Sequence, residues 1–282
     1  MVLEQYRLMK SVPNLTYDVN FLVTNESGMF LNSIGTFFIN KLNALKNFFQ
    51  DETKIFNLKQ DQFIEDMLID YNKNKKTIAK LNFMDLANNE YPWSEVFCKN
   101  LYDVSINLSV AFKELDNIII SNIDNTDTLI TKAVANRDFI KTTTPLVSNV
   151  EETEKVLKKC YEAIDKIIDP NFRKDKVKLK EAIPNFSSLE SIINNLILIK
   201  EMKFYEKASL LEKTVKSIKE KTDNLEIILK QANPNEVSKP IISMIAMELE
   251  TSAKVISCLG TLLAATSQAA KTLQTIIREI CK

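Results

Sequence analysis

Residues 187–232 read SSLESIINNLILIKEMKFYEKASLLEKTVKSIKEKTDNLEIILKQA and contain neither glycine nor proline. Ser187 and Glu190 have the spacing of a capping box, which marks a helix start, and Pro234 marks its end. A helix of this length spans about 65 Å, more than the width of a compact domain of this size. From Phe204 onward, apolar or small residues recur at alternating steps of four and three, which is a heptad seam and predicts a partner helix. The seam positions are Phe204, Ala208, Leu211, Val215, Ile218, Thr222, Leu225 and Leu229.

The whole chain is poor in glycine. Only Gly28, Gly35 and Gly260 occur among 282 residues, whereas glycine averages about 7% of protein residues. Sheet turns and phosphate-binding loops depend on the positive φ angles that glycine adopts. Residues 94–122 contain a second heptad seam, so the sequence predicts an all-α fold, an elongated helical bundle with coiled-coil-like long helices. The positions of the second seam are Phe97, Leu101, Val104, Leu108, Ala111, Leu115 and Ile118.

The last predicted helix covers residues 240–281 and is crowded with small residues between Thr251 and Ala270. Small residues let helix backbones approach closely, so this helix is expected at the centre of a bundle or of an oligomer. A short turn with Pro234 joins it to the helix at 187–232. The two helices are therefore predicted to form an antiparallel hairpin.

These patterns divide the chain into four segments. Residues 1–25 are expected to form an extended or flexible arm, and residues 26–170 an N-terminal helical region. Residues 171–186 are a Lys-rich linker, and residues 187–282 form the long helical hairpin.

The composition argues against most catalytic chemistry. The chain has no histidine, which is the commonest general base and metal ligand. It also lacks the phosphate-binding, dinucleotide-binding and nucleophile-elbow motifs. The chain has four cysteines without CxxC spacing, and they are expected to be small buried hydrophobic residues, with disulfides between helices as the open alternative. They are Cys98, Cys160, Cys258 and Cys281. We therefore predict a non-enzymatic protein without a metal or cofactor.

Charge and hydropathy bear on partners and location. Lys plus Arg and Asp plus Glu both number 37, so nucleic acid is not expected to be the primary partner. The first residues, MVLEQYRLMK, carry charges where a signal peptide has an apolar core. The longest uncharged run, residues 255–270, is shorter than a membrane-spanning helix requires. The expected location is the cytoplasm or a virion.

A candidate interaction face lies on an amphipathic helix predicted at residues 26–50. Its apolar stripe is rich in phenylalanine, and its opposite face is mildly basic. Such a helix either packs on the core of the bundle or binds a partner or a membrane surface. The residues of this face are Phe30, Leu31, Ile34, Phe37, Phe38, Leu42, Leu45, Phe48 and Phe49.

A candidate patch for an anionic partner lies in the Lys-rich linker. Its residues are Arg173, Lys174, Lys176, Lys178 and Lys180. The cluster is either a solvated linker surface or a contact for nucleic acid or for the acidic surface of another protein.

Composition and the N-terminal region also carry a resemblance. The chain is rich in Lys, Asn and Ile, lacks histidine, and has GMFLNSIGTFFINKLNALKNFF at residues 28–49 after a short leader. In these features it resembles virion structural proteins of large tailed bacteriophages, such as internal head or tail-associated components. The resemblance implies a structural or assembly protein whose partners are copies of itself or other protein subunits.

Two alternatives stay open at the level of sequence. Elongated α-helical pore-forming toxins resemble the chain in having a long bundle with an apolar segment held in reserve, here residues 27–40 or 255–270. The other alternative is a cytoplasmic adaptor that binds a partner helix through residues 26–50.

Overall fold

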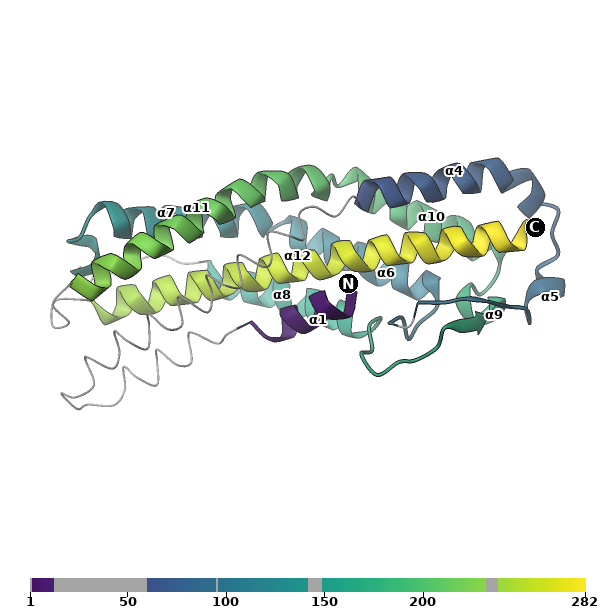
Figure 1. Ribbon diagram of the computed structural model, residues 1–282, viewed down its shortest axis with the longest axis horizontal. Coiled ribbons are helices and arrows are strands. Elements are labelled where there is room, and N and C mark those ends of the chain that lie inside the picture. The colour runs from purple at the N-terminus through teal and green to yellow at the C-terminus, as the bar shows by residue number, and fades with distance from the viewer. Residues whose placement is uncertain (1, 13–59, 95, 142–148, 232–237) are drawn as a thin grey trace.

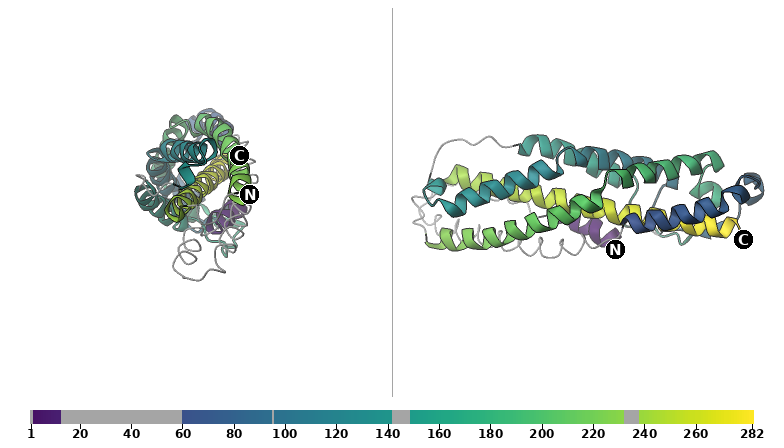
Figure 2. Two further views of the ribbon diagram at one scale, coloured as in Figure 1. Left: turned by 90° about the vertical axis from the view of Figure 1, so that its left-hand side faces the viewer. Right: turned by 90° about the horizontal axis from the view of Figure 1, so that it is seen from above.

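The axis of the molecule is one uninterrupted helix, α12 (Lys239–Ile280), which has 42 residues and a length of about 63 Å. Figure 1 shows α12 running through an elongated bundle, with other helices lying along it. The end-on view in Figure 2 shows the helices gathered around one long axis. The computed structural model describes residues 2–12, 60–94, 96–141, 149–231 and 238–282.

The other described elements are mostly helices of about one to eight turns. They are α1 (Val2–Lys10), α4 (Gln60–Ile78), α5 (Phe83–Leu86), α6 (Leu101–Asp116), α7 (Ile119–Ala135), the 3-10 helix η2 (Phe139–Lys141), α8 (Val150–Asp165), α9 (Leu179–Ala182), α10 (Phe186–Glu201) and α11 (Phe204–Gln231). Strands β1 (Glu90–Pro92) and β2 (Lys176–Lys178) form a small antiparallel pair, with Tyr91 opposite Val177. The prediction of an all-α, elongated helical fold is confirmed.

The two halves of α12 have different neighbours. Helices α4, α6 and α10 lie in the half that contains the C-terminal end of α12, on the right in Figure 1. Helices α7 and α11 lie in the other half, and α8 packs on both α6 and α12. Because buried side chains from both halves belong to one continuous hydrophobic core, α12 holds the whole rod together.

The small residues of α12 are buried, as the prediction of a central helix requires. Ala253, Ser257, Cys258 and Ala270 have essentially no exposed surface. The Ser257 hydroxyl donates a hydrogen bond to the Ala253 carbonyl at 2.7 Å, so this buried polar group is satisfied within the helix. Small and internally satisfied side chains allow several helices to pack closely around α12.

The helix predicted at 187–232 is divided in the structure, so that prediction is wrong in one respect. Helix α10 ends at Glu201, and Lys203 adopts a left-handed backbone conformation with φ of 55°. Phe204 then starts α11 and packs against Phe112 with ring centroids 4.7 Å apart. The break has a physical reason, because α10 packs on α6 and α4 whereas the seam of α11 must face α7.

The predicted capping residue also differs. Asn185, rather than Ser187, caps α10, and its Oδ1 accepts the Ser188 backbone N–H at 2.9 Å. Asparagine is as good a cap as serine, and an asparagine two residues earlier starts the helix sooner.

Most of the described positions of the two heptad seams are buried, and Leu229 is half-buried. On α11, Leu211, Val215, Ile218 and Leu225 are at most 2% exposed, and α7 is the main partner of this face. Helix α12 returns antiparallel to α11 as predicted for a hairpin, yet α11 packs far more on α7 than on α12. All seven positions of the seam at 94–122 are buried, although Phe97 lies before α6 and Ile118 between α6 and α7, so the seam is not carried by one helix.

Two segments expected to lack regular structure contain elements. In the predicted arm at 1–25, Val2–Lys10 is helical because Val2 and Met9 are buried against the bundle. The Tyr6 hydroxyl donates to Asp165 Oδ1 at 2.9 Å, and burial and this bond raise the pKa of Tyr6 to about 12. In the predicted linker at 171–186, β2 and α9 form because Val177 and Leu179 are buried.

Candidate functional site

Among the described residues, one candidate binding site is a surface groove between α4 and α10, with a volume of about 390 Å³. We call it the α4–α10 groove. Each helix contributes four side chains at positions i, i+3, i+4 and i+7, which is the spacing of one helix face. Helix α4 contributes Leu68, Tyr71, Asn72 and Lys75. Helix α10 contributes Glu190, Ile193, Asn194 and Ile197.

The two helices run antiparallel beside each other. Lys200 forms an ion pair with Glu65 at 2.8 Å, and the Tyr71 hydroxyl lies 3.4 Å from Glu190 Oε1. These two contacts fix the register of the helices: Lys200 near the end of α10 meets Glu65 near the start of α4, and Glu190 near the start of α10 meets Tyr71 farther along α4. The position along the rod of each residue on the α4 side can therefore be compared with that of each residue on the α10 side.

The floor of the groove is apolar and its rim is polar. Ile193 and Tyr71 are buried, Leu68 and Ile197 are half-buried, and the remaining lining residues are exposed. Ile69, the residue next to Leu68, is 64% exposed but does not line the groove. An apolar floor with a polar rim, lined by two helix stripes, is the shape that receives helices of a partner.

One tyrosine organises the charges at one end of the groove. The Lys75 ammonium lies over the Tyr71 ring, 5.8 Å from its centroid, and Glu190 faces the hydroxyl of the same tyrosine. Burial and the Glu190 carboxylate raise the pKa of Tyr71, which therefore stays a neutral donor. Neither Lys75 nor Glu190 forms an ion pair with any residue in the described ranges.

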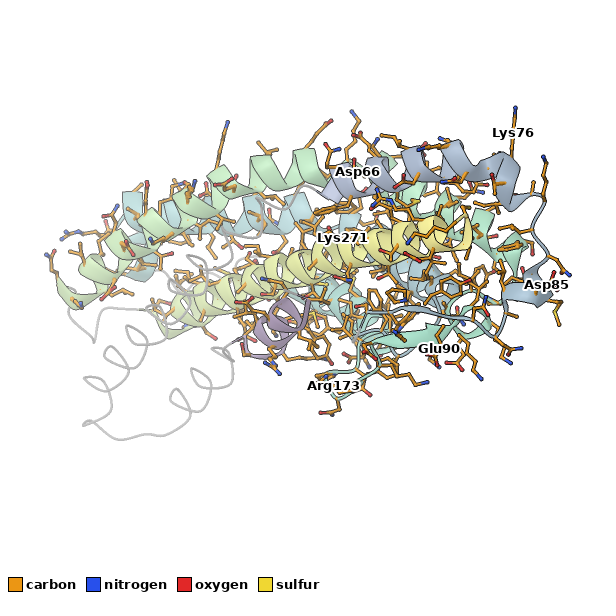
Figure 3. The ribbon with its side chains drawn as sticks, turned by 45° about the vertical axis from the view of Figure 1, so that its right-hand side comes forward. Asp66, Lys76, Asp85, Glu90, Arg173 and Lys271 are labelled. Carbon is orange, nitrogen blue, oxygen red and sulfur yellow. The ribbon has the colours of Figure 1, made fainter. Side chains whose placement is uncertain are left out.

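The candidate patch for an anionic partner is brought together only in part. Lys176 and Lys178 point outward from the same face of β2, with Val177 buried between them. Lys174, however, pairs with Glu181 at 3.4 Å. Glu90, on the same side of the molecule as Arg173 in Figure 3, lies opposite Lys178 in the strand pair. Nearby carboxylates thus reduce the net positive charge.

The remaining members of this patch are solvated. The Arg173 guanidinium donates to the neighbouring Phe172 carbonyl at 2.7 Å, and Lys180 is exposed at the surface. The candidate interaction face at residues 26–50 lies outside the described residues.

A buried polar cluster joins α7 to α12. The Thr126 and Ser252 hydroxyls lie 2.7 Å apart, and Ser252 donates to Asn122 Oδ1 at 2.9 Å. Thr126 also lies within 3.3 Å of the Glu248 carbonyl. The members satisfy one another, so the cluster fixes how α7 sits on α12.

The four cysteines and the described carboxylates can be compared with the requirements of a chemical centre. All four cysteines are free; Cys160 and Cys258 are buried as expected, whereas Cys98 and Cys281 are only half-buried. Burial raises the pKa of the Cys258 thiol, which lies beside Cys160. A protonated, buried thiol is a poor nucleophile and a poor metal ligand. Within the part of the chain that the structure describes, no group of three or more cysteine or carboxylate side chains is arranged to hold a metal ion.

None of the helices in the described ranges combines the length and apolar character needed to cross a membrane.

Sequence reasoning missed the α4–α10 groove. The stripe on each helix is visible in the sequence as a spacing of three, four and seven. Tyr71 and Glu190 are 119 residues apart, however, and no local pattern indicates that their helices are neighbours.

Comparison of the chain with family models, curated proteins and solved structures gave no match.

Proposed function

We propose that this chain is a non-enzymatic structural protein that assembles, with copies of itself or with other protein subunits, by packing helix faces together. The α4–α10 groove carries this proposal. It brings together one face of each helix, with the half-buried Leu68 and Ile197 on an apolar floor and with two charges that lack ion-pair partners among the described residues. A groove of this kind gains stability when further helices cover its floor.

The rest of the molecule suits such a role. A rod built around one 42-residue helix provides long, fixed surfaces whose spacing does not change when a partner binds. The resemblance to virion structural proteins favours a phage particle as the setting, with an internal head or tail-associated position.

The experiment is light scattering coupled to size exclusion, performed on the full chain at two concentrations. We expect a mass above that of one chain and an elution position typical of an elongated particle. A chain that remains a monomer at both concentrations would contradict assembly with copies of itself. Pull-down with purified neighbouring subunits would then be the remaining test of the proposal.

A second candidate, membrane activity, has one observation in its favour. The run at 255–270 carries no charge, and its hydroxyls bond within the helix, as Thr261 does to the Ser257 carbonyl at 3.0 Å. The same run is buried at the axis of the bundle, so exposing it requires the rod to open. Dye release from liposomes by the purified chain separates the two functions, and we expect none.

A further inference from the structure

The α4 side and the α10 side of the α4–α10 groove carry opposite charges at nearly the same position along the rod. Lys75 on α4 and Glu190 on α10 are both exposed, and both are held by Tyr71. Within the described ranges neither charge has an ion-pair partner. A surface with a positive side and a negative side at one position along the rod is complementary to a second copy of itself that is rotated by 180° about the rod direction.

We propose that the occupant of the groove is the same groove of a second copy, an inference that rests on the proposed function. The two rods lie side by side and parallel, related by a twofold axis that runs along the helices. Helix α4 of each copy then covers α10 of the other. In this arrangement Lys75 of each copy meets Glu190 of the other, which forms two equivalent ion pairs.

The apolar floor fits the same arrangement. Because Glu65 pairs with Lys200 and Tyr71 meets Glu190, the level of Leu68 lies near that of Ile193 and Ile197. Leu68 of one copy therefore lies over the half-buried Ile197 of the other, at the level of the buried Ile193. Asn72 and Asn194 are exposed on the outer rims, where their amides can donate and accept hydrogen bonds across the contact.

The size of the contact sets its expected strength. Helix α10 has 16 residues and is about 24 Å long, and two adjacent helices are about 20 Å wide. The contact then buries about 1,000 Å² counted over both copies, which is at the low end of specific interfaces. We therefore expect a dimer that dissociates on dilution in the micromolar range.

The test is sedimentation velocity of the full chain between about 1 and about 100 µM, a range that brackets the expected dissociation constant. The variants are Lys75→Glu, Glu190→Lys and the double exchange. Each single variant replaces both ion pairs of the dimer by pairs of like charges, so the dissociation constant of the dimer should rise at least about tenfold. The double exchange restores opposite charges and should return the dissociation constant to within about threefold of the original.

The matched control is Lys76→Glu, the same charge change on the next residue of α4. Lys76 is exposed, does not line the groove and points away from the bundle in Figure 3, so the dimer should persist. Helix content and melting temperature of every variant, followed by circular dichroism, confirm that the fold is intact.

The outcomes separate this inference from the proposed function. If the chain forms oligomers that neither single variant weakens, or that the double exchange fails to restore, the groove is not the contact, and the proposed function stands. If the unmodified chain is a monomer throughout the concentration range, the inference is wrong and self-assembly fails with it.

Discussion

Asp70 ties α4 to the C-terminal end of α12. Its Oδ2 accepts hydrogen bonds from Gln274 Nε2 at 2.6 Å and from Arg278 Nε at 2.8 Å. Burial alone would raise the pKa of Asp70, but these hydrogen bonds and the Arg278 charge lower it below the usual value of 3.8. The ionised form is therefore favoured by folding.

A carboxylate with a lowered pKa stabilises the fold at pH values above its unfolded pKa, and this contribution is lost as the pH falls through the folded pKa. Asp70→Asn should therefore lower the free energy of unfolding by about 1 kcal/mol at neutral pH, a modest value because Arg278 is largely exposed. The difference from the unmodified chain should vanish in strong acid. Urea unfolding at both pH values measures it, and the exposed Asp85 in α5, replaced by Asn, serves as the control. A difference that is the same at both pH values would contradict the role of the charge.

Lys203 is the residue at which the backbone turns between α10 and α11. A φ of 55° is unfavourable for any residue with a Cβ atom, and glycine adopts it without this cost. Lys203→Gly should therefore raise the free energy of unfolding by roughly 0.5 to 1 kcal/mol, since part of the gain is offset by greater freedom of the unfolded chain.

The same substitution at Lys213, exposed within α11, is the control and should lower the free energy of unfolding by about 1 kcal/mol. Denaturant unfolding of the two variants should give changes of opposite sign. Equal destabilisation would mean that the left-handed conformation at Lys203 is not maintained in solution.

At the scale of the elements, the seam of α11 distinguishes an inward face from an outward one. Leu225 is fully buried, whereas Ile227, only two residues away, is 52% exposed. Leu225→Asp places a charge without a partner in the seam against α7 and should cost several kcal/mol. Ile227→Asp should cost less than about 1 kcal/mol, because its side chain already contacts water. Thermal melting followed by circular dichroism compares them, and similar losses would show that this face of α11 is not the packed one.

The elements also show what sequence patterns can and cannot predict. The periodic burial of Leu211, Val215 and Leu225 follows from spacing alone, because helix geometry converts spacing into a face. The turn at Lys203 cannot be predicted in this way, because no glycine or proline marks it in the sequence. It arises because α10 and α11 pack against different neighbours. Contacts between distant segments, such as Asp70 with Arg278 and the α4–α10 groove, are likewise fixed only by the assembled bundle.

At the scale of the whole molecule, α12 makes the two halves of the rod depend on each other. The Thr126–Ser252 contact attaches α7 to its N-terminal half, and Asp70 attaches α4 to its C-terminal half. The helix between these points is continuous and buried. Unfolding either half exposes one side of the same helix, so the halves should unfold together rather than separately.

The single tryptophan makes this cooperativity measurable. Trp93 follows β1, lines a small hollow with Gln268 and Thr272 of α12, and donates its Nε1–H to the Phe97 carbonyl at 2.8 Å. It therefore reports on the half of the rod that contains the C-terminal end of α12. Leu225 lies in the other half, where α11 packs on α7.

Leu225→Asp should consequently shift the urea midpoint of Trp93 fluorescence by as much as that of far-ultraviolet circular dichroism, which reports on all helices. Ile227→Asp is again the matched control and should move neither midpoint appreciably. If instead the Trp93 transition keeps its original midpoint while the circular dichroism transition moves to lower urea, the two halves unfold independently. A continuous helix would then not be enough to couple them, and each half would have to be stabilised by its own packing.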